Sequence, residues 1–216
     1  MTCLNLVRFE LLEKDYAWNA SHVGNSSTAG KQILHFGPHE RMRRDIKACP
    51  RVHQVSVDFF AEGYKYHSSV QQADIRSLNF PDESMDVVIC LHVLEHVRQL
   101  SVAMFELVRV LKPRGTALVE VPCHADRGHH IDCSHLNSTS ERIICGGEFG
   151  QRDHVWNLGC LALASQLQNF GLNCTDVSIP SNKEVARLYR VAKAQRSPLL
   201  PFFICVKAEF DVHNKR

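Results

Sequence analysis

Long apolar runs, a strong net charge and a basic N-terminal leader are all missing from this chain. No apolar stretch approaches the roughly 20 residues that a membrane-spanning helix requires. The formal net charge of +2 is far from the strongly basic balance of a general nucleic-acid-binding domain. Because no basic start is followed by an apolar stretch, we expect no secretory signal, and the cytosol is the expected location.

The nine cysteines include no Cys-x-x-Cys pair, which is a signature of redox and zinc sites. Their number is odd, and both Cys90 and Cys205 stand inside apolar strand patterns. We therefore expect reduced thiols that pack as small hydrophobic side chains, as in a reducing compartment.

Internal repeats and a second domain are also missing, and 216 residues suffice for one domain with one hydrophobic core. Apolar patterns predict strands over 33–36, 52–59, 69–75, 85–91, 116–121, 175–179 and 202–210. Helical periodicity predicts helices over 4–18, 102–111, 158–170 and 184–195, with a charged helix between 38 and 48. Strands that alternate with helices in this way indicate βαβ units and a mostly parallel sheet.

The most informative run covers residues 86–97 and reads Asp-Val-Val-Ile-Cys-Leu-His-Val-Leu-Glu-His-Val. It opens as a buried strand and changes within two residues to a helix-like pattern that carries His92, Glu95 and His96. Two imidazoles and a carboxylate at the carboxyl end of a strand stand where open α/β sheets bind ligands.

Further groups follow the neighbouring strands: Gly37 after the first, Asp58 after the second, and Asp74 with Ile75 after the third. An Asp that ends a strand is often only a turn or cap residue. Taken together, the order and spacing of these positions favour a ligand that has a ribose and an adenine.

Residues 31–122 resemble the core of class I S-adenosylmethionine-dependent methyltransferases of the type-11 kind. The matching blocks are 33–40 (Ile-Leu-His-Phe-Gly-Pro-His-Glu), 73–75, 79–82, the 86–97 run and 107–115. Residues 149–155 (Phe-Gly-Gln-Arg-Asp-His-Val) resemble a signature of a bacterial-type branch, whose Leu-His-Phe-Ala-Pro-Glu motif is close to the first block. The resemblance covers about residues 31–170 and implies a doubly wound, Rossmann-like α/β sheet of seven strands with the last one antiparallel.

The resemblance implies methyl transfer from S-adenosylmethionine to a small-molecule acceptor with an oxygen, nitrogen or sulfur nucleophile. It places the ribose on Asp58 and the adenine near Asp74 and Ile75. Because the glycine turn is lost, Glu40 or His39 is expected to contact the ammonium group of the donor. The full set of expected donor-binding residues is His35, Phe36, Gly37, Glu40, Asp58, Phe59, Asp74, Ile75, Cys90, Leu91 and His96.

Two departures from the family pattern concern the binding of the donor and the binding of the acceptor. The Gly-x-Gly-x-Gly turn is absent, and Gly37 is followed by Pro38, which has no backbone N–H to offer the methionine end of the donor. The family's Arg after Asp-His-Val is Trp156 here, so an aromatic face replaces a charge. This exchange favours an aromatic or heteroaromatic acceptor.

On the acceptor side we expect His154 first and His92 second to act on the acceptor proton, with Asp153 beside His154. The alternative is a buried Asp153–His154 pair that only locks a loop over the sheet. The expected substrate-binding residues are His124, His129, His130, Trp156 and Tyr16.

The segment 123–157 also holds metal-ligating residue types in an irregular order: Cys123, His124, His129, His130, Cys133 and His135. Their spacing matches no structural zinc pattern, so we expect no metal site. An acceptor pocket and a polar surface loop are the two alternatives for this segment.

We predict a single domain over 1–216, with an N-terminal helix and loop at 1–30, a donor-binding core at 31–122, an acceptor-side insert at 123–157 and a C-terminal part at 158–216. Rival hypotheses are a non-catalytic donor-binding or scaffold protein and a His/Cys metal-binding protein on this fold. Basic residues recur at 183–196 and give weak support to a nucleic-acid substrate. We expect a small-molecule partner and no membrane.

Overall fold

The computed structural model describes residues 30–49, 52–136, 138–146, 153–176 and 202–209. The predicted helices at 4–18 and 184–195 lie outside these residues, as do Tyr16 and residues 149–152 of the signature. None of the described helices has the length and apolar character to cross a membrane.

A seven-stranded sheet forms the centre of the described structure, in the order β3-β2-β1-β4-β5-β10-β9. Strand β10 pairs antiparallel with both β5 and β9, while β3, β2, β1, β4 and β5 pair parallel. The strands are β1 (Lys31–Phe36), β2 (Val52–Asp58), β3 (Val70–Gln72), β4 (Met85–Leu91), β5 (Leu111–Glu120), β9 (Leu172–Asp176) and β10 (Phe202–Lys207). The prediction of a doubly wound seven-stranded sheet with an antiparallel last strand is confirmed.

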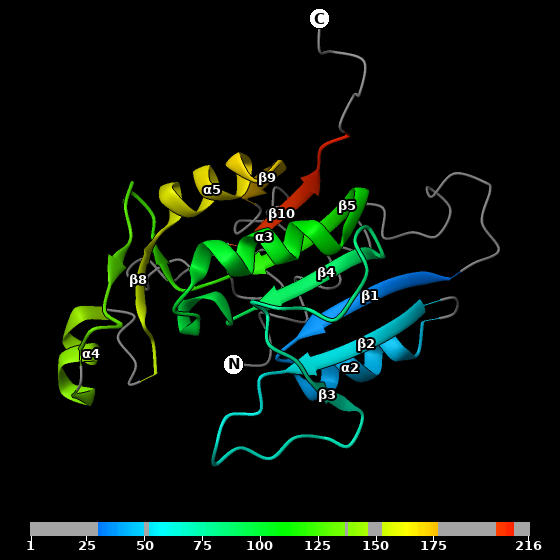
Figure 1. Ribbon diagram of the computed structural model, residues 1–216, viewed down its shortest axis with the longest axis horizontal. Helices are drawn as coiled ribbons and strands as arrows, with labels where there is room; N and C mark the ends of the chain where they lie inside the picture. Colours follow the sequence, from blue (N-terminus) through cyan, green and yellow to red (C-terminus); the bar gives the residue numbers. More distant parts are fainter. Residues whose placement is uncertain (1–29, 50–51, 137, 147–152, 177–201, 210–216) are drawn as a thin grey trace, which may run out of the picture.

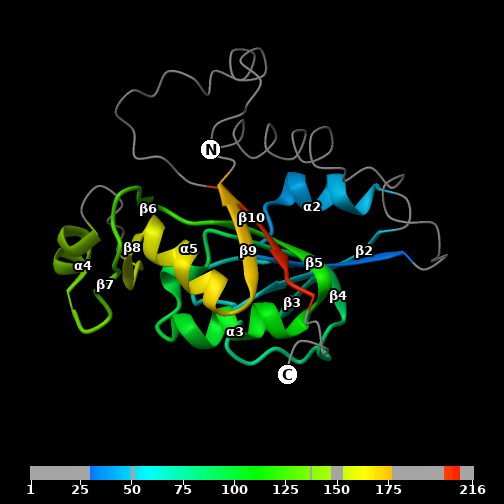
Figure 2. The same cartoon turned by 90° about the horizontal axis from the view of Figure 1, so that it is seen from above.

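Helices cover both faces of this sheet (Figure 2). Helix α2 (Glu40–Lys47) lies on one face, and α3 (Leu100–Val110) and α5 (Cys160–Asn169) lie on the other. Successive residues of β4 alternate between the two cores: Ile89 packs in the cluster that includes Ile46 of α2, and Val88 packs with residues of α3 and α5. A strand that is buried on both faces reads as a continuous apolar run, which is why its sequence predicts it so clearly.

The parallel register brings the ends of β1, β2 and β4 to one edge of the sheet. Phe36, the last residue of β1, lies opposite Val57 of β2 and Cys90 of β4. In Figure 1 the arrowheads of these strands point toward the side of the molecule that carries β8 (Trp156–Gly159) and α4 (Thr139–Gly146). The insert therefore stands beside the carboxyl edge, where ligands bind in open α/β sheets.

The turn before β4 is fixed to α3 by one side chain. Arg109 donates hydrogen bonds to the backbone carbonyls of Leu78 and Phe80, and to the carboxylates of Asp82 and Glu106. Glu106 in turn accepts a hydrogen bond from the backbone N–H of Leu78 at 2.7 Å. The sequence blocks 79–82 and 107–115 therefore have a structural role, because Arg109 of the second block holds the turn that contains the first.

The insert is more regular than its sequence predicts. It contains β6 (Cys123–His124), β7 (Ile131–Asp132), α4 and β8, and the three strands form a small sheet in the order β6-β8-β7. Strands of two to four residues are too short to show a period of two, so their pairing is visible only in three dimensions.

Six cysteines are paired as disulfides: Cys123 with Cys160, Cys133 with Cys145, and Cys174 with Cys205. The expectation of reduced thiols is therefore wrong for these six, because chain spacing says nothing about which cysteines the fold brings together. Disulfides are typical of oxidising compartments, so the cysteines no longer support a cytosolic location.

Thiol titration checks this pairing. Since the sequence has nine cysteines and six of the described ones are paired, we expect the unreduced protein in denaturant to show at most three thiols, 9 minus 6, and the reduced protein nine. Ellman's reagent measures both numbers. Nine thiols before reduction, in protein kept under oxidising conditions, would contradict the pairing.

Candidate functional site

Three strand ends meet at Gly37, which directly follows β1. Its φ of +51° is in the left-handed region that favours glycine, and its backbone N–H donates to the carbonyl of Val57 at 3.0 Å. A Cβ at this position would lie 3.5 Å from Val93 Cγ2 and 3.9 Å from Asp58 Oδ2. The bare backbone at Gly37 therefore lies within reach of the Asp58 carboxylate and of the chain after β4.

Asp58 ends β2 with a half-buried carboxylate. Burial raises its pKa, and hydrogen bonds from the backbone N–H groups of Phe59 and Phe60 partly offset this. The Phe59 N–H donates to Asp58 Oδ1 at 2.7 Å. Phe59 itself is exposed, and Phe60 stacks on Tyr66 with the ring centroids 4.3 Å apart. A half-buried carboxylate that accepts a hydrogen bond from the backbone therefore stands at the edge of the sheet.

Asp74 follows β3 and is engaged by Arg76. Both carboxylate oxygens accept hydrogen bonds from the Arg76 guanidinium, and Oδ1 also accepts from the Arg76 backbone N–H. These contacts lower the pKa of Asp74, most through the side-chain hydrogen bonds. Ile75 is buried beside it.

Several predicted donor-binding residues lie behind this edge. His35, Phe36 and Cys90 are buried inside the sheet layers, so their side chains support the edge from within. The carboxylate of Glu40 accepts two hydrogen bonds from Arg43, at 3.0 and 2.8 Å, and so has a partner on its own helix.

His92 begins the turn after β4 with a φ of +54°, and its backbone N–H donates to the carbonyl of Glu120 at 2.8 Å. Its Nδ1 lies 3.4 Å from Glu95 Oε1, and its Nε2 lies 3.8 Å from Glu120 Oε1. Both carboxylates are buried, at 1% and 0% exposure. His92 therefore lies between two buried carboxylates.

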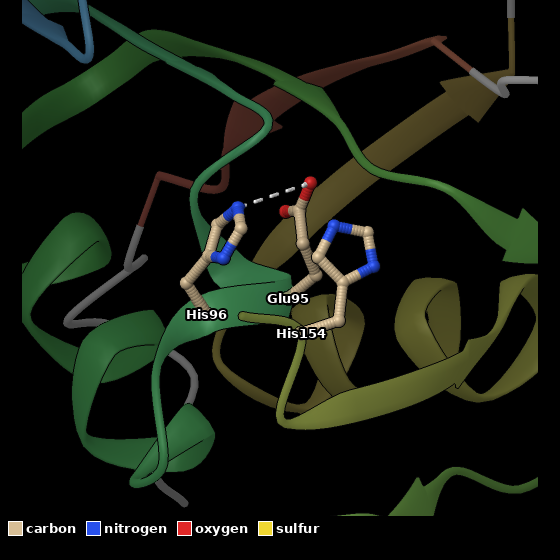
Figure 3. Close-up of side chains that lie close together, drawn as sticks. All are labelled: Glu95, His96 and His154. Carbon is tan, nitrogen blue, oxygen red and sulfur yellow. Dashed lines mark ion pairs between the residues drawn. The ribbon is translucent and has the colours of Figure 1, made fainter. Parts of the chain in front are cut away.

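Glu95 also lies beside two further imidazoles (Figure 3). The segment that the sequence predicts as helix-like is a single 3-10 turn, η1 (Leu94–His96). His96 Nε2 lies 3.9 Å from Glu95 Oε1, and the His96 and His154 rings meet edge to face with centroids 4.8 Å apart. His154 is 4% exposed.

The residues that lead into β8 are docked on this turn by three hydrogen bonds. The Val155 N–H donates to the Glu95 carbonyl at 2.9 Å, and the Trp156 indole N–H donates to the Val97 carbonyl at 2.8 Å. His96 Nδ1 lies 3.2 Å from the Asp153 carbonyl and 3.7 Å from Asp153 Oδ2. The imidazole beside the Asp153 carboxylate is therefore that of His96, whereas the sequence predicts His154.

The predicted acceptor-side residues of the insert gather around two neighbouring cavities. His129, His130 and Trp156 line one of about 670 Å³, together with residues of α3 and α5. His124 lines the other, of about 490 Å³, where His129 also takes part. Trp156 meets His130 edge to face at 6.2 Å.

Gly159 is closely surrounded at the junction of β8 and α5. A Cβ there would collide with the backbone carbonyl oxygens of Arg127 and His129, and the Gly159 N–H donates to His130 Nδ1 at 3.1 Å. We expect Gly159→Ala to displace the 127–130 loop and to lower the free energy of unfolding by about 1–3 kcal/mol, as overpacking does. Urea unfolding measures this, with Gly128→Ala as the matched control because a Cβ at Gly128 meets nothing within 4 Å. Equal stability of the two variants would contradict the prediction.

Sequence reasoning missed Glu120 and did not identify Glu95 as the centre of the imidazole cluster. The available signal was weak: Glu120 is the one charged residue in the run 116–121, and a charge at the end of an apolar strand indicates a ligand edge. Of the metal-ligating residue types listed for the insert, Cys123 and Cys133 are held in disulfides and so do not serve as metal ligands.

Residues 27–119 match the family model described as "Methyltransferase domain". This part of the chain is therefore similar to methyltransferase domains. Among curated proteins it is 31% identical over 145 residues to "Uncharacterized methyltransferase YcgJ" of Bacillus subtilis, which covers 60% of this chain and 57% of that protein. It is 30% identical over 98 residues to "Probable S-adenosylmethionine-dependent methyltransferase Rv3030" of Mycobacterium tuberculosis, covering 43% and 36%. The chain thus spans between about a third and three fifths of these relatives.

Solved structures share the fold. The crystal structure of Bacillus subtilis YcgJ aligns over 84% of this chain and 93% of that one, with a TM-score of 0.55 and 16% identity. A methyltransferase from Archaeoglobus fulgidus aligns over 94% of each chain, with a TM-score of 0.54 and 18% identity. The names of the Mycobacterium tuberculosis protein and of the Archaeoglobus fulgidus structure describe those proteins as S-adenosylmethionine-dependent methyltransferases.

Proposed function

We propose that this chain transfers the methyl group of S-adenosylmethionine to a small-molecule acceptor. One observation carries the proposal: the Asp58 carboxylate and Val93 both lie within 4 Å of the position that a side chain on Gly37 would take. Bare backbone beside a carboxylate, at the carboxyl edge of a parallel sheet, fits a ligand that carries a ribose. The residues present therefore fit the donor, although the family's glycine-rich turn is missing.

In this proposal Asp58 accepts hydrogen bonds from both ribose hydroxyls, and Gly37 lets the backbone approach the methionine part. Phe59, Ile75 and Leu91 line the adenine, with Asp74 at its polar edge. Glu40 assists at the ammonium group, while His35, Phe36, Cys90 and His96 support these contacts from behind. When bound, S-adenosylmethionine supplies a methyl group on a positively charged sulfur, which a nucleophile displaces in line.

We place the acceptor on the other side of the chain that follows β4. The imidazoles of His92 and His154 meet it, and Asp153 positions His96. The neighbouring cavity of about 670 Å³ has the volume of a small-molecule pocket, and Trp156 and His130 give it aromatic walls. This supports a small aromatic or heteroaromatic acceptor, held by His124, His129, His130 and Trp156.

A label-transfer experiment tests the class of acceptor. The purified chain is incubated with S-adenosylmethionine that carries a labelled methyl group and with a cell extract separated into small-molecule, protein and nucleic-acid fractions. We expect label in the small-molecule fraction, and no transfer by Asp58→Ala. Label that enters only protein or nucleic acid would overturn the small-molecule acceptor, and no transfer to any fraction would favour a donor-binding protein without catalysis.

A further inference from the structure

We propose that Glu95, His96 and His154 bind one divalent transition-metal ion. One ligand atom from each of these residues lies within 4.8 Å of the other two. Figure 3 shows the carboxylate of Glu95 beside both imidazole rings, with His96 and Glu95 coming from η1 and His154 from the segment before β8. The site rests on this geometry alone, and only the role given to the ion below rests on the proposed function.

A cation placed between His96 Nε2 and Glu95 Oε1 is electrostatically favourable. A backbone carbonyl only accepts hydrogen bonds, so His96 Nδ1, at 3.2 Å from the Asp153 carbonyl, must carry the hydrogen. In a neutral ring Nε2 then holds a lone pair, and it faces Glu95 Oε1 at 3.9 Å. Two acceptors that face each other gain from a positive charge placed between them.

Glu95 gives an independent indication. Its side chain is 1% exposed, and its Oε2 accepts no hydrogen bond from any described residue. Burying a carboxylate without a hydrogen bond costs free energy, and buried charges are normally paired or bound to a metal. The nearby imidazoles supply ligands of the kind that such an ion needs.

The surroundings of His96 are those of a metal-binding histidine. Such histidines almost always donate their second ring N–H to a carbonyl or a carboxylate, which fixes the tautomer and the ring orientation. Here the Asp153 carbonyl does this at 3.2 Å, with Asp153 Oδ2 at 3.7 Å. The hydrogen bond from Val155 to the Glu95 carbonyl holds the neighbouring His154 against the same carboxylate.

Two imidazoles and one carboxylate suit zinc or a neighbouring first-row ion and leave a coordination position open. Zinc–nitrogen bonds of about 2.0–2.1 Å separate two tetrahedral ligands by about 3.4 Å. The ligand atoms of the cluster lie up to 4.8 Å apart, so they must approach one another by up to about 1.4 Å. His96, which is one-third exposed, has room to move. The expectation that the chain has no metal site was based on the cysteines and histidines at positions 123–135, and none of these belongs to this cluster.

If the proposed function holds, the open position takes an acceptor hydroxyl or thiol. A bound cation favours the deprotonated form of such a group, whose proton passes to solvent. The freed electron pair then forms the bond to the methyl carbon, while the electron pair of the breaking carbon–sulfur bond stays on the sulfur of the donor.

Metal binding is tested on the full chain without a histidine tag, which is dialysed against a chelator and then incubated with excess Zn²⁺, without added donor. We expect one Zn²⁺ per chain by elemental analysis after gel filtration, and Co²⁺ in the same site to show the visible absorption of a low-symmetry, four-coordinate ion. His154→Asn and His96→Gln are each expected to weaken Zn²⁺ binding at least about 100-fold, more than the loss of an outer partner usually costs. Thermal melts establish that each variant is folded.

His129→Gln is the matched control, because this exposed histidine of the insert is not among the three ligands. It should bind Zn²⁺ as the wild type does. The proposal is overturned by wild-type protein that holds less than about a tenth of a Zn²⁺ per chain, by folded ligand variants that bind Zn²⁺ normally, or by loss of binding in His129→Gln. Donor binding by the metal-free protein is measured separately, so failure of the metal site and failure of the proposed function are distinguishable.

Discussion

Asp58→Ala is expected to weaken the binding of S-adenosylmethionine by about 100-fold or more. In the proposed complex this carboxylate accepts hydrogen bonds from both ribose hydroxyls, and a hydrogen bond to a charged group contributes about 1.5–3 kcal/mol. Loss of about 3 kcal/mol corresponds to slightly more than a hundredfold rise in Kd. Isothermal titration calorimetry with S-adenosylmethionine and with S-adenosylhomocysteine measures the change.

Asp45→Ala is the matched control for this variant. Asp45 is also an aspartate, but it lies on the exposed side of α2, where it pairs only weakly with Arg41 at 3.8 Å. We expect this variant to bind the donor as the wild type does. A Kd for Asp58→Ala within about threefold of the wild-type value would place the donor elsewhere, and wild-type protein that binds neither ligand would refute the donor site.

Acidification is expected to destabilise the protein over the range between about pH 6.5 and pH 3, because of one buried histidine. Burial, together with the charges of Arg43 and His39, lowers the pKa of His35 from 6.5 to about 3. The side chain is 1% exposed, and its Nδ1 lies 2.8 Å from the amide nitrogen of Gln54. Its place in β1, between the two helical layers, leaves no water to solvate an imidazolium.

The sign of the effect follows from proton binding. Between these pH values the unfolded chain holds a proton on His35 and the folded chain does not, so the free energy of unfolding falls as the pH falls. This one group contributes at most about 1.4 kcal/mol per pH unit. The stability linked to neutral His35 is complete above the unfolded pKa and is lost progressively below it.

Urea unfolding at a series of pH values measures this slope in the wild type, in His35→Gln and in His53→Gln. Removing the titrating group at position 35 should flatten the slope in this range. His53 is exposed on the neighbouring strand, so its removal should leave the slope unchanged. Identical slopes in the wild type and His35→Gln would show that His35 does not control the acid response.

The core elements could be predicted because their signals are local. The run 85–91 is apolar on both faces and follows a clear turn, and β4 occupies these residues without any shift. The pattern of Val102, Phe105 and Val108 predicts α3, which the fold extends to begin at Leu100. Short elements such as β7 and β8 could not be predicted, because two to four residues carry no readable period.

The positions of Gly37, Asp58 and His92 at strand ends could also be predicted, because parallel strands bring their carboxyl ends to one edge of the sheet independently of side-chain packing. The hydrogen-bond or ion-pair partner of each side chain could not be predicted. Asp74 is held by Arg76 and Glu40 by Arg43, and the Asp153 carboxylate lies beside His96 and not beside its neighbour in the chain as expected.

The sequence by itself determined the alternation of strands and helices, the edge of the sheet to which the strand ends come and the residue types that stand there. Tertiary structure alone decided that His154 meets His96 and Glu95, and that six cysteines are paired. The physical reason is distance along the chain: the period of a strand or a helix acts over a few residues. By contrast, the hydrogen bonds from Val155 to Glu95 and from Trp156 to Val97 join segments about 60 residues apart, and only the path of the folded backbone sets them.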